Sequence, residues 1–444
     1  MNSPVIIIPI ETSARELLYK QILCTKLANQ GFTCYLGSKS QVTPLLSRGR
    51  NYIYLDKGYH KGVSESLYAT IRSNGGNIVS LDEEGGIDFG DNSTLLGRYS
   101  PQLFEASSIV FLWGKKQREI VKSHILDPRR VKITGHPRFE LLKPEHNALY
   151  RNESDRIVSK YGDFILFNTN MGFGNNIKGD KFVIKNYGKR FKNIEQIVAF
   201  DKQKIKAIES AVLAVAEQYP EMTIIIRPHP EEDMDPYIQA FGQYKKIKVI
   251  FKGSAVPWLL AAKAMIHPDC TTAVESLFIG SKSLSILPED HPKDLVTHIP
   301  LEASSAHTSI ESLLKELKTM LQERREINWE DHPFAEAYFS VSLKTLETIV
   351  HSLKELGLTL QSTGFNIDSI FLRDRLRLEI GILRRRFKGG PAAKLIKNKL
   401  TGLNRGAIRS NQRIIDNFLD VKDTSLSQLT AELVRYNAFT GDKG

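Results

Sequence analysis

The stretch Val5–Ile10 reads VIIIPI, a short run of mostly β-branched apolar residues, and a helical pattern over residues 14–30 follows it at once. Runs of this length are typical of buried strands, and strands that alternate with helices favour a parallel sheet with crossover helices. The alternation continues to residue 134. It predicts further strands at 33–37, 52–55, Asn77–Leu81, 108–113 and 131–134, and helices at Ser64–Ser73 and 115–124.

A second cycle of the same kind begins at Phe164–Asn168. It predicts strands at 222–227, 248–251, Ala264–His267 and 283–287, and helices at 201–218 and 271–279. Because 444 residues exceed what one compact core usually holds, the two cycles predict an α/β protein with two Rossmann-like, doubly wound domains that face each other across a cleft. We assign residues 1–150 to the first domain, 151–357 to the second, with helices after 302 crossing back over both, and 365–444 to a basic helical extension.

The composition, with 41% hydrophobic and 25% charged residues, is that of a soluble globular protein. No run approaches the roughly 20 apolar residues that span a bilayer, and the start of the chain lacks the basic region and cleavage site of a signal peptide. The three cysteines, Cys24, Cys34 and Cys270, are scattered without metal-ligand spacing. We therefore expect a cytoplasmic protein and no metal site.

Positive charge is concentrated in one segment. Residues 368–415 hold 13 Lys or Arg and 3 Asp or Glu, a net of +10 in a chain whose net charge is +11. The segment carries an apolar helical stripe flanked by arginines, formed by Leu372, Leu376, Ile380, Leu383 and Phe387 with Arg373, Arg377, Arg384 and Arg385. Basic amphipathic helices lie on anionic membranes, so we expect peripheral attachment to the inner face of the cytoplasmic membrane.

Two other interpretations of this segment remain open. A helix packed on the protein body, or one at an oligomer contact, would show the same pattern. A nucleic-acid partner is not expected, because no aromatic residues are interleaved with the basic ones to stack on bases.

Ligands of open α/β sheets bind beyond the carboxyl ends of the strands, so the residues that follow predicted strands are candidates for a site. Asp82, Glu83 and Glu84 come directly after Asn77–Leu81. Repulsion among three adjacent carboxylates would raise the pKa of at least one of them, and such a group can remove a proton from an acceptor hydroxyl. A solvated acidic turn is the alternative.

Arg227 and His229 follow the very apolar strand at 222–227, and the prolines on either side of His229 fix its backbone. A pair of cationic side chains at the mouth of a cleft suits a phosphate or pyrophosphate. A rigid surface turn would also explain the two prolines.

A third cluster of candidate nucleotide-binding residues begins with His267, where a strand ends. Thr271 or Thr272 would begin the next helix, where backbone N–H groups and hydroxyls bind anions. Glu275 would lie one turn further on, positioned to accept hydrogen bonds from ribose hydroxyls, with Ser276 beside it. An ordinary helix start with a carboxylate favoured by the helix dipole is the alternative.

Weaker candidates follow other strands. Arg138 lies in a Gly-His-Pro-Arg turn, and Asn168 and Asn170 begin a Gly/Asn-rich loop that would face the cleft. Glu11 and Arg15 follow the first strand and would reach the acceptor side, although Glu11 and Arg15 also have the spacing of a helical ion pair.

Together these clusters resemble those of bacterial surface-carbohydrate glycosyltransferases of the GT-B fold, which build capsules and O-antigens. The resemblance covers most of residues 4–290. It rests on residues 10–17, 82–85, 113–114, 135–138, 227–230 and 271–276. An acidic motif ending in Gly and a His-Pro motif look like those of bacterial sialyltransferases, and similar His-Pro and Thr/Ser-rich helix starts occur in Kdo transferases and teichoic-acid glycerophosphotransferases.

The resemblance implies Glu83 or Glu84 as the catalytic base, His229 as a ligand of the donor phosphate, and Thr271, Thr272 and Ser276 near the nucleotide. It further implies transfer of a sugar of sialic acid or Kdo type from a CMP-activated donor to a surface polysaccharide or lipid-linked glycan, without a metal or other cofactor. Three alternatives remain: a CDP-glycerol-type glycerophosphotransferase, a nucleotide-sugar epimerase, which needs a second acid/base group beside the sugar, and a non-enzymatic scaffold that binds polyanions.

Overall fold

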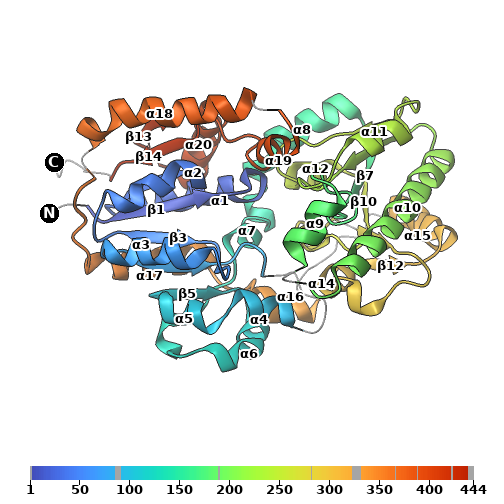
Figure 1. Ribbon diagram of the computed structural model, residues 1–444. Helices are drawn as coiled ribbons and strands as arrows, with labels where there is room; N and C mark the ends of the chain where they lie inside the picture. The colour runs from blue at the N-terminus through green and yellow to red at the C-terminus, as the bar shows by residue number, and fades with distance from the viewer. Residues whose placement is uncertain are drawn as a thin grey trace.

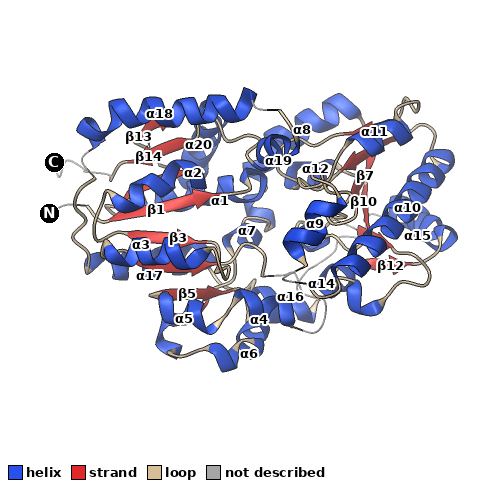
Figure 2. Ribbon diagram, in the orientation of Figure 1, coloured by secondary structure: helices blue, strands red, loops and turns tan. Residues whose placement is uncertain are grey.

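The computed structural model describes residues 3–85, 92–188, 191–281, 283–322, 332–365, 367–387, 389–421 and 424–438. They form two α/β domains, each with its own sheet, and the predicted architecture is confirmed. In Figure 1 the first domain lies at the left and the second at the right, and Figure 2 shows the two sheets in red, separated by the central helices.

The first sheet runs in the order β13-β14-β2-β1-β3-β4-β5-β6 through the described part of the chain. Neighbouring strands from β2 to β6 are parallel, whereas β13 and β14 form an antiparallel hairpin that pairs with β2. The bounds are β1 Val5–Ile10, β2 Thr33–Ser38, β3 Ile53–Asp56, β4 Asn77–Leu81, β5 Ile109–Leu112, β6 Val131–Ile133, β13 Leu426–Thr430 and β14 Leu433–Tyr436.

Helices cover both faces of this sheet. Before the second domain begins they are α1 Ser13–Ala28, α2 Lys39–Val42, α3 Ser64–Ser73, α4 Ser93–Arg98, α5 Pro101–Ala106, α6 Lys115–Ile120 and α7 Pro137–Glu140. Since side chains alternate along a strand, Ile6, Ile8 and Ile10 of β1 pack into one core and Val5 and Ile7 into the other. A strand buried on both faces reads as a continuous apolar run, which explains the VIIIPI sequence.

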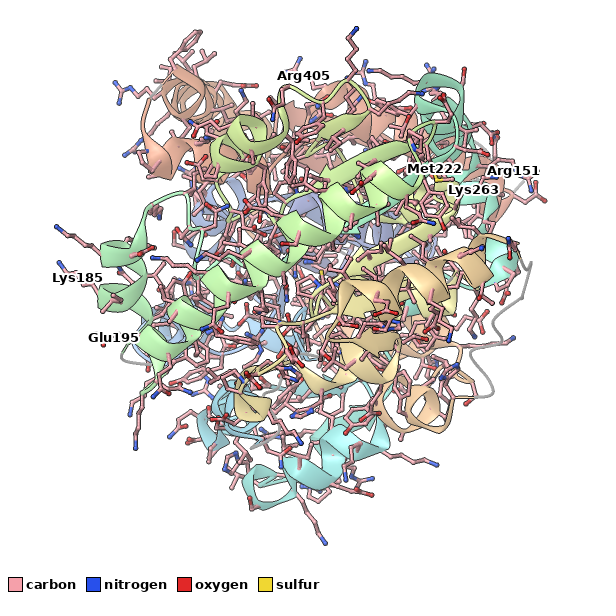
Figure 3. All side chains as sticks on the ribbon, turned by 90° about the vertical axis from the view of Figure 1, so that its right-hand side faces the viewer. Arg151, Lys185, Glu195, Met222, Lys263 and Arg405 are labelled. Atoms are coloured by element: carbon pink, nitrogen blue, oxygen red, sulfur yellow. The ribbon has the colours of Figure 1, made fainter. Side chains whose placement is uncertain are left out.

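The second sheet, in the order β12-β11-β10-β7-β8-β9, is parallel. Its strands are β7 Phe164–Asn168, β8 Thr223–Arg227, β9 Ile247–Val249, β10 Ala264–His267, β11 Ser283–Ile286 and β12 Ser305–His307. Its helices are α8 Ala148–Tyr161, α9 Asp180–Tyr187, α10 Ile194–Gln218, α11 Asp235–Phe241, α12 Val256–Ala261, α13 Thr272–Phe278, α14 His298–Glu302 and α15 Ile310–Gln322. Figure 3 views this domain from outside, where α10 crosses it from near Glu195 toward Met222.

After α15 the chain returns to the first domain. The remaining helices are α16 Pro333–Phe339, α17 Thr345–Leu358, α18 Ile367–Phe387, α19 Pro391–Lys399 and α20 Arg405–Leu419. Helix α17 packs on α1 and α7, so it crosses back to the first domain, as expected for helices after residue 302, and the second domain ends before residue 357. The expected helical extension at 365–444 is also wrong at its end, since β13 and β14 are strands that cover the otherwise unpaired edge of β2.

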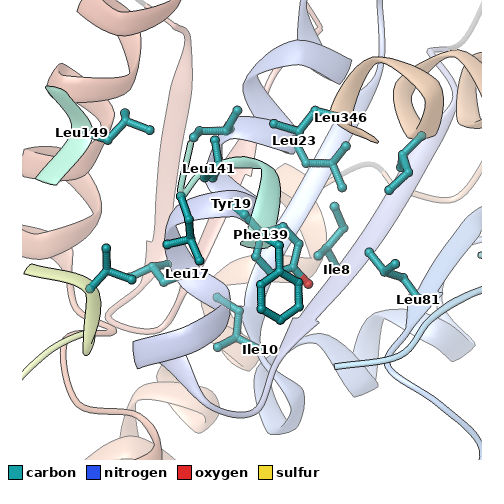
Figure 4. Packing of buried hydrophobic residues seen from close by; sticks show 14 of the residues in the cluster. Ile8, Ile10, Leu17, Tyr19, Leu23, Leu81, Phe139, Leu141, Leu149 and Leu346 are labelled. Atoms are coloured by element: carbon teal, nitrogen blue, oxygen red, sulfur yellow. The ribbon is translucent and has the colours of Figure 1, made fainter. Parts of the chain in front are cut away.

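Helix α1 is enclosed on most sides. It lies between the sheet, α17 and α20, and Figure 4 shows its Leu17, Tyr19 and Leu23 packed with Ile8 of β1 and Leu346 of α17. Polar residues of α1 are therefore buried too and need partners: Gln21 Nε2 donates to the Ile408 carbonyl of α20 and to the Tyr436 hydroxyl of β14, both at 3.0 Å. The C-terminal segment is thus an integral part of the first domain.

A substitution at Gly37 on β2 tests the pairing of the C-terminal hairpin with this strand. A Cβ atom there would lie 2.6 Å from the Glu432 carbonyl oxygen and 2.9 Å from Leu433 Cδ1. Because the nearest atom belongs to the backbone, we expect Gly37→Ala to lower the free energy of unfolding by about 1–3 kcal/mol, measured as a lower melting temperature. Gly97→Ala on α4, where a Cβ meets no atom within 4 Å, is the control and should be neutral or slightly stabilising; equal melting temperatures would contradict the pairing.

Candidate functional site

A cleft of about 990 Å³ opens between the two domains. It is lined by residues that follow β1, β7, β8 and β10, which is the edge of each sheet where open α/β proteins bind ligands. In the second sheet β7 and β10 are neighbours at the point where the strand order reverses. The lining includes ten Lys or Arg and six Asp or Glu, so the cleft is net positive and suits an anionic ligand.

Arg15 and His229 meet across the cleft from opposite domains. Arg15 lies in the first turn of α1, His229 follows β8, and Arg15 Nη2 is 3.2 Å from His229 Nε2. The other ring nitrogen of His229, Nδ1, accepts the Glu231 N–H at 3.3 Å. Burial and the Arg15 charge lower the pKa of His229 to about 4, so the imidazole is neutral at pH 7. Both residues line the cleft. Arg15, expected on the acceptor side, thus lies next to the residue expected to contact the donor phosphate.

Arg227 also lines the cleft, but its guanidinium is committed to the protein. It donates to the carbonyls of Lys252 at 2.8 Å and Gly253 at 3.1 Å and lies over the Trp258 ring. Burial lowers its pKa to about 10. These hydrogen bonds hold the loop after β9 against the cleft.

A second contact joins the domains between Arg138 and Glu275. Arg138 Nε lies 3.6 Å from Glu275 Oε1, and the guanidinium packs over Phe139. This distance is too long for a hydrogen bond, and the buried Nε–H has no acceptor among the described residues. Thr271 and Thr272 begin α13 next to this pair, as predicted, and both line the cleft.

The three adjacent carboxylates separate into different environments. Asp82 is buried and binds Arg98, with Arg98 Nε 2.7 Å from Asp82 Oδ2. Glu84 turns toward the cleft and accepts from Arg98 Nη1 at 2.8 Å. It also lies close enough to His229 to act on the pKa of that ring. Of the two candidates for a base, Glu84 is the one that lines the cleft.

Glu83 points inward, behind the cleft. It accepts a short hydrogen bond from Tyr19, lies 3.1 Å from Lys20 Nζ and 3.5 Å from His136 Nε2. Burial opposes its ionisation, but Lys20, His136 and Tyr19 hold the pKa of Glu83 well below its ordinary value. The expected rise in pKa is therefore wrong for Glu83, because Lys20 on α1 neutralises it.

His136 takes a defined tautomer in this network. Its Nδ1 accepts the Arg138 N–H at 3.1 Å, so its proton sits on Nε2 and faces Glu83. The ring is buried between Tyr19 and Trp113, and burial lowers its pKa.

A second buried lysine fixes the loops of the C-terminal domain. Lys204 Nζ of α10 lies 2.8 Å from Asp201 Oδ1 and 3.1 Å from Asp269 Oδ1, and these carboxylates raise its pKa although burial alone would lower it. Asp201 accepts the backbone N–H groups of Phe173 and Gly174 in the Gly/Asn loop. Lys204 therefore ties the loop after β7 to the loop after β10.

The two asparagines of the Gly/Asn loop line the cleft as predicted. Asn168 Nδ2 donates to the Thr272 hydroxyl at 3.1 Å, and Asn170 Nδ2 donates to Asp269 Oδ1 at 3.0 Å. Both bonds cross from β7 to the segment that follows β10, so the asparagines position that segment.

Three predicted binding residues do not line the cleft. His267 is fully buried, with Nδ1 accepting the Cys270 N–H at 3.2 Å and Nε2 2.7 Å from the Ser304 hydroxyl. Ser276 is buried and donates to the Ser281 carbonyl. Glu11 pairs with Lys57 at 2.6 Å and Lys39 at 2.9 Å, which lower its pKa to about 2 against the effect of burial. Their polar groups are satisfied within the protein, so their assignment as ligand contacts is corrected to structural roles.

Sequence reasoning missed the contribution of the C-terminal helices. Lys399, at the end of α19, pairs with Glu231 at 2.6 Å, and its carbonyl accepts from the Ser13 hydroxyl of α1 at 3.1 Å. Lys399 and residues between Thr401 and Ile414 line the cleft. The segment therefore bridges both domains at the edge of the cleft, which a charge pattern read alone could not show.

Within the described ranges, no three His, Cys, Asp or Glu side chains are grouped so as to hold a metal ion.

Comparisons with known proteins identify the fold. The sequence matches no protein-family model and no curated protein. A structure assigned as a UDP-N-acetylglucosamine 2-epimerase from Listeria monocytogenes is 13% identical, with a TM-score of 0.50 over 80% of this chain and 96% of that chain. MnaA of S. aureus, solved with UDP, gives 14% and 0.50 over 80% and 96% of the chains, and the UDP-GlcNAc 2-epimerase of Methanocaldococcus jannaschii gives 13% and 0.50 over 80% and 100%.

These similarities show the fold. The chain has the GT-B arrangement of two Rossmann-like domains.

Replacing Lys204 with Met tests the loop anchor. Removal of the ammonium leaves two buried carboxylates without a counter-charge, and we expect a loss of about 3–5 kcal/mol in the free energy of unfolding, measured by denaturant titration. Lys202→Met, two residues away in an exposed pair with Asp180, is the control and should change stability by less than about 0.5 kcal/mol. Similar losses of unfolding free energy in both variants would show that the buried Lys204 ion pairs contribute no more than an exposed pair.

Stability should also depend on His267 in a defined pH window. Burial lowers the pKa of His267 from its ordinary 6.5 to about 4. Between these values the unfolded chain binds a proton that the folded state excludes, so the contribution is present above pH 6.5 and is lost as the pH falls toward 4, by about 3 kcal/mol for this group. His267→Asn should flatten the fall in melting temperature across that window. A slope as steep as that of the parent protein would contradict the assignment.

Proposed function

We propose that the cleft binds a nucleotide-activated sugar, with the donor phosphate held between Arg15 and His229. The observation that carries this proposal is the 3.2 Å approach of these side chains from opposite domains. Because His229 Nδ1 accepts the Glu231 N–H, the ring proton belongs on Nε2. Arg15 also has only donors, so neither nitrogen can accept from the other and both need an acceptor. A phosphate oxygen accepts from both at once.

Other groups in the cleft fit the same ligand. The buried Nε–H of Arg138 is available to a second acceptor on the nucleotide-sugar, and Thr271 and Thr272 lie beside it. A volume of about 990 Å³ is at the upper end for small-molecule sites, which leaves room for an acceptor next to the donor.

Glu84 is the base that we propose for glycosyl transfer. It is the carboxylate of the acidic motif that lines the cleft, and Arg98 orients it. The acceptor hydroxyl gives its proton to Glu84 while its oxygen forms the new bond to the anomeric carbon. The bond from that carbon to the donor phosphate breaks, and its electron pair stays on the phosphate, where Arg15 and neutral His229 donate hydrogen bonds.

The carrier and acceptor rest on the motif resemblance. It favours a CMP-linked sugar of sialic acid or Kdo type and a surface polysaccharide or lipid-linked glycan as acceptor. A glycerophosphoryl donor would use the same phosphate contacts, so CDP-glycerol belongs in any screen.

Epimerisation of a UDP-sugar is a second candidate. The structures with which the chain shares its fold include the UDP-GlcNAc 2-epimerase of Methanocaldococcus jannaschii and MnaA of S. aureus, which was solved with UDP. Epimerisation needs two acid/base groups beside the sugar, and Glu84 and Glu275 line the cleft from opposite domains.

A binding screen tests the donor site. Thermal shift with CMP-, UDP- and GDP-sugars and CDP-glycerol should show stabilisation by one nucleotide, on the order of 2–3 kcal/mol at a hundredfold excess over Kd. Arg15→Ala and His229→Ala should each weaken that binding about ten- to a hundredfold, since each removes a hydrogen bond to a charged group. Lys116→Ala, exposed on α6, is the control. Stabilisation by none of these compounds would overturn the proposal.

Turnover tests the base. Glu84→Gln should retain donor binding and lose about 10²–10⁴-fold in kcat, whereas the exposed Glu119→Gln should be unaffected. Product analysis by NMR separates transfer to an acceptor from epimerisation of the donor. Full activity in Glu84→Gln would exclude Glu84 as the base, and a non-enzymatic scaffold would show no turnover in the parent protein.

A further inference from the structure

Helix α18 presents a continuous apolar stripe to solvent. Leu376, Ile380, Leu383 and Phe387 are 64%, 38%, 49% and 85% exposed. Their spacing of four, three and four residues places them on one face of the helix. Ile382, on the opposite face, is buried toward the first domain. The helix is thus apolar on its inner side, where the protein covers it, and apolar again on its outer side.

Exposed apolar side chains are concentrated in this region. Among the described residues fourteen large hydrophobic side chains are exposed, and five of them lie between Leu376 and Ile396. Single exposed hydrophobic residues are common on soluble proteins, but contiguous ones mark an interaction surface.

Basic side chains flank the stripe. At about 100° per residue, Arg377 and Arg384 lie on the same flank, two turns apart, and both are exposed without an ion pair to any residue that the structure describes. Arg385 differs, because it faces inward and pairs with Glu432 at 2.6 Å. The acidic residue near the stripe, Glu379, is already engaged by Arg405 and by the Ala431 N–H.

We propose that this outer face of α18, formed by Leu376, Ile380, Leu383 and Phe387 with Arg377 and Arg384, docks onto an anionic lipid surface. An apolar stripe that enters the headgroup region, with cations beside it, is the arrangement that binds such surfaces. None of the helices in the described ranges is long and apolar enough to cross a bilayer. Because the stripe runs along the length of α18, docking would lay the helix in the plane of the surface.

Charge favours lipid over a second copy of the chain. Two copies that met on this face would bring the unpaired arginines of both into one interface, and Glu379 is not free to offset them. Anionic headgroups supply the opposite charge.

The position of α18 gives the docking face a consequence for the cleft. Helix α19 begins at Pro391, close in sequence to the end of α18 at Phe387, and Lys399 at the end of α19 lines the cleft. In Figure 1 α18 runs along the upper edge of the first domain, with α19 next to it toward the second domain. Docking would therefore hold the α19 edge of the cleft near the lipid surface. Lipid binding by α18 does not depend on which reaction takes place in the cleft.

Vesicle binding by the full chain tests the proposal. The protein should cosediment with phosphatidylcholine vesicles that contain a quarter phosphatidylglycerol, and much less with pure phosphatidylcholine. Arg377→Gln/Arg384→Gln should weaken binding on the order of thirtyfold, and Leu383→Glu/Phe387→Glu at least as much. Leu126→Glu, at a comparably exposed leucine of the first domain (63%), should bind like the parent. Equal melting temperatures would show that all variants are folded.

Three results would overturn the proposal. They are a failure of the parent chain to bind anionic vesicles, equal binding of the parent to neutral vesicles, and binding by the α18 variants that equals that of the parent. Sedimentation velocity without lipid provides a further test. Self-association that Leu383→Glu/Phe387→Glu abolishes would assign the face to a second copy instead.

Discussion

Each domain is organised around one buried lysine between two carboxylates. Lys20 of α1 lies between Glu16 and Glu83, and Lys204 of α10 lies between Asp201 and Asp269. In both cases one carboxylate comes from the lysine's own helix and the other from a loop beyond a strand. An ion pair without water demands close geometry, because a displaced partner leaves an uncompensated buried charge. The lysines thereby fix the strand-end loops from which the cleft is built.

The cleft walls are in turn connected by contacts between the domains. Arg15 meets His229, Arg138 meets Glu275, and Lys399 of α19 joins Glu231 on one side to Ser13 on the other. These contacts place positive charges and hydrogen-bond donors near the proposed binding position of the donor phosphate. A ligand that bridges the same groups would add further contacts between the two domains.

Much of this organisation is visible in the sequence. Apolar runs such as Val5–Ile10 and Phe164–Asn168 mark parallel strands because both faces are buried, and the residues after them do gather at one cleft. The sequence could not separate Glu83 from Glu84, because the difference depends on Lys20, which lies about 60 residues earlier on another element. Nor could it show that the polar faces of α1 are enclosed.

For amphipathic helices, too, the sequence does not show which neighbours cover the apolar face. Helices α18 and α20 are both basic, yet α20 buries Ile408 and Ile415 against the first domain while α18 leaves its stripe exposed. A helical pattern identifies an apolar face but not what covers it. The hairpin of β13 and β14 carries an even weaker signal, since its strands are short and partly polar and owe their conformation to pairing with β2.

That pairing also bears on how the protein is made. Strand β14 contacts β2 across about 400 residues of chain, and long-range pairing of this kind forms late because a large loop must close first. The second domain, by contrast, takes every described strand of its sheet from residues 164–307. During synthesis the second domain can therefore complete its sheet before the first domain does. The sheet of the first domain keeps β2 as an unpaired edge until β13 and β14 have been synthesised.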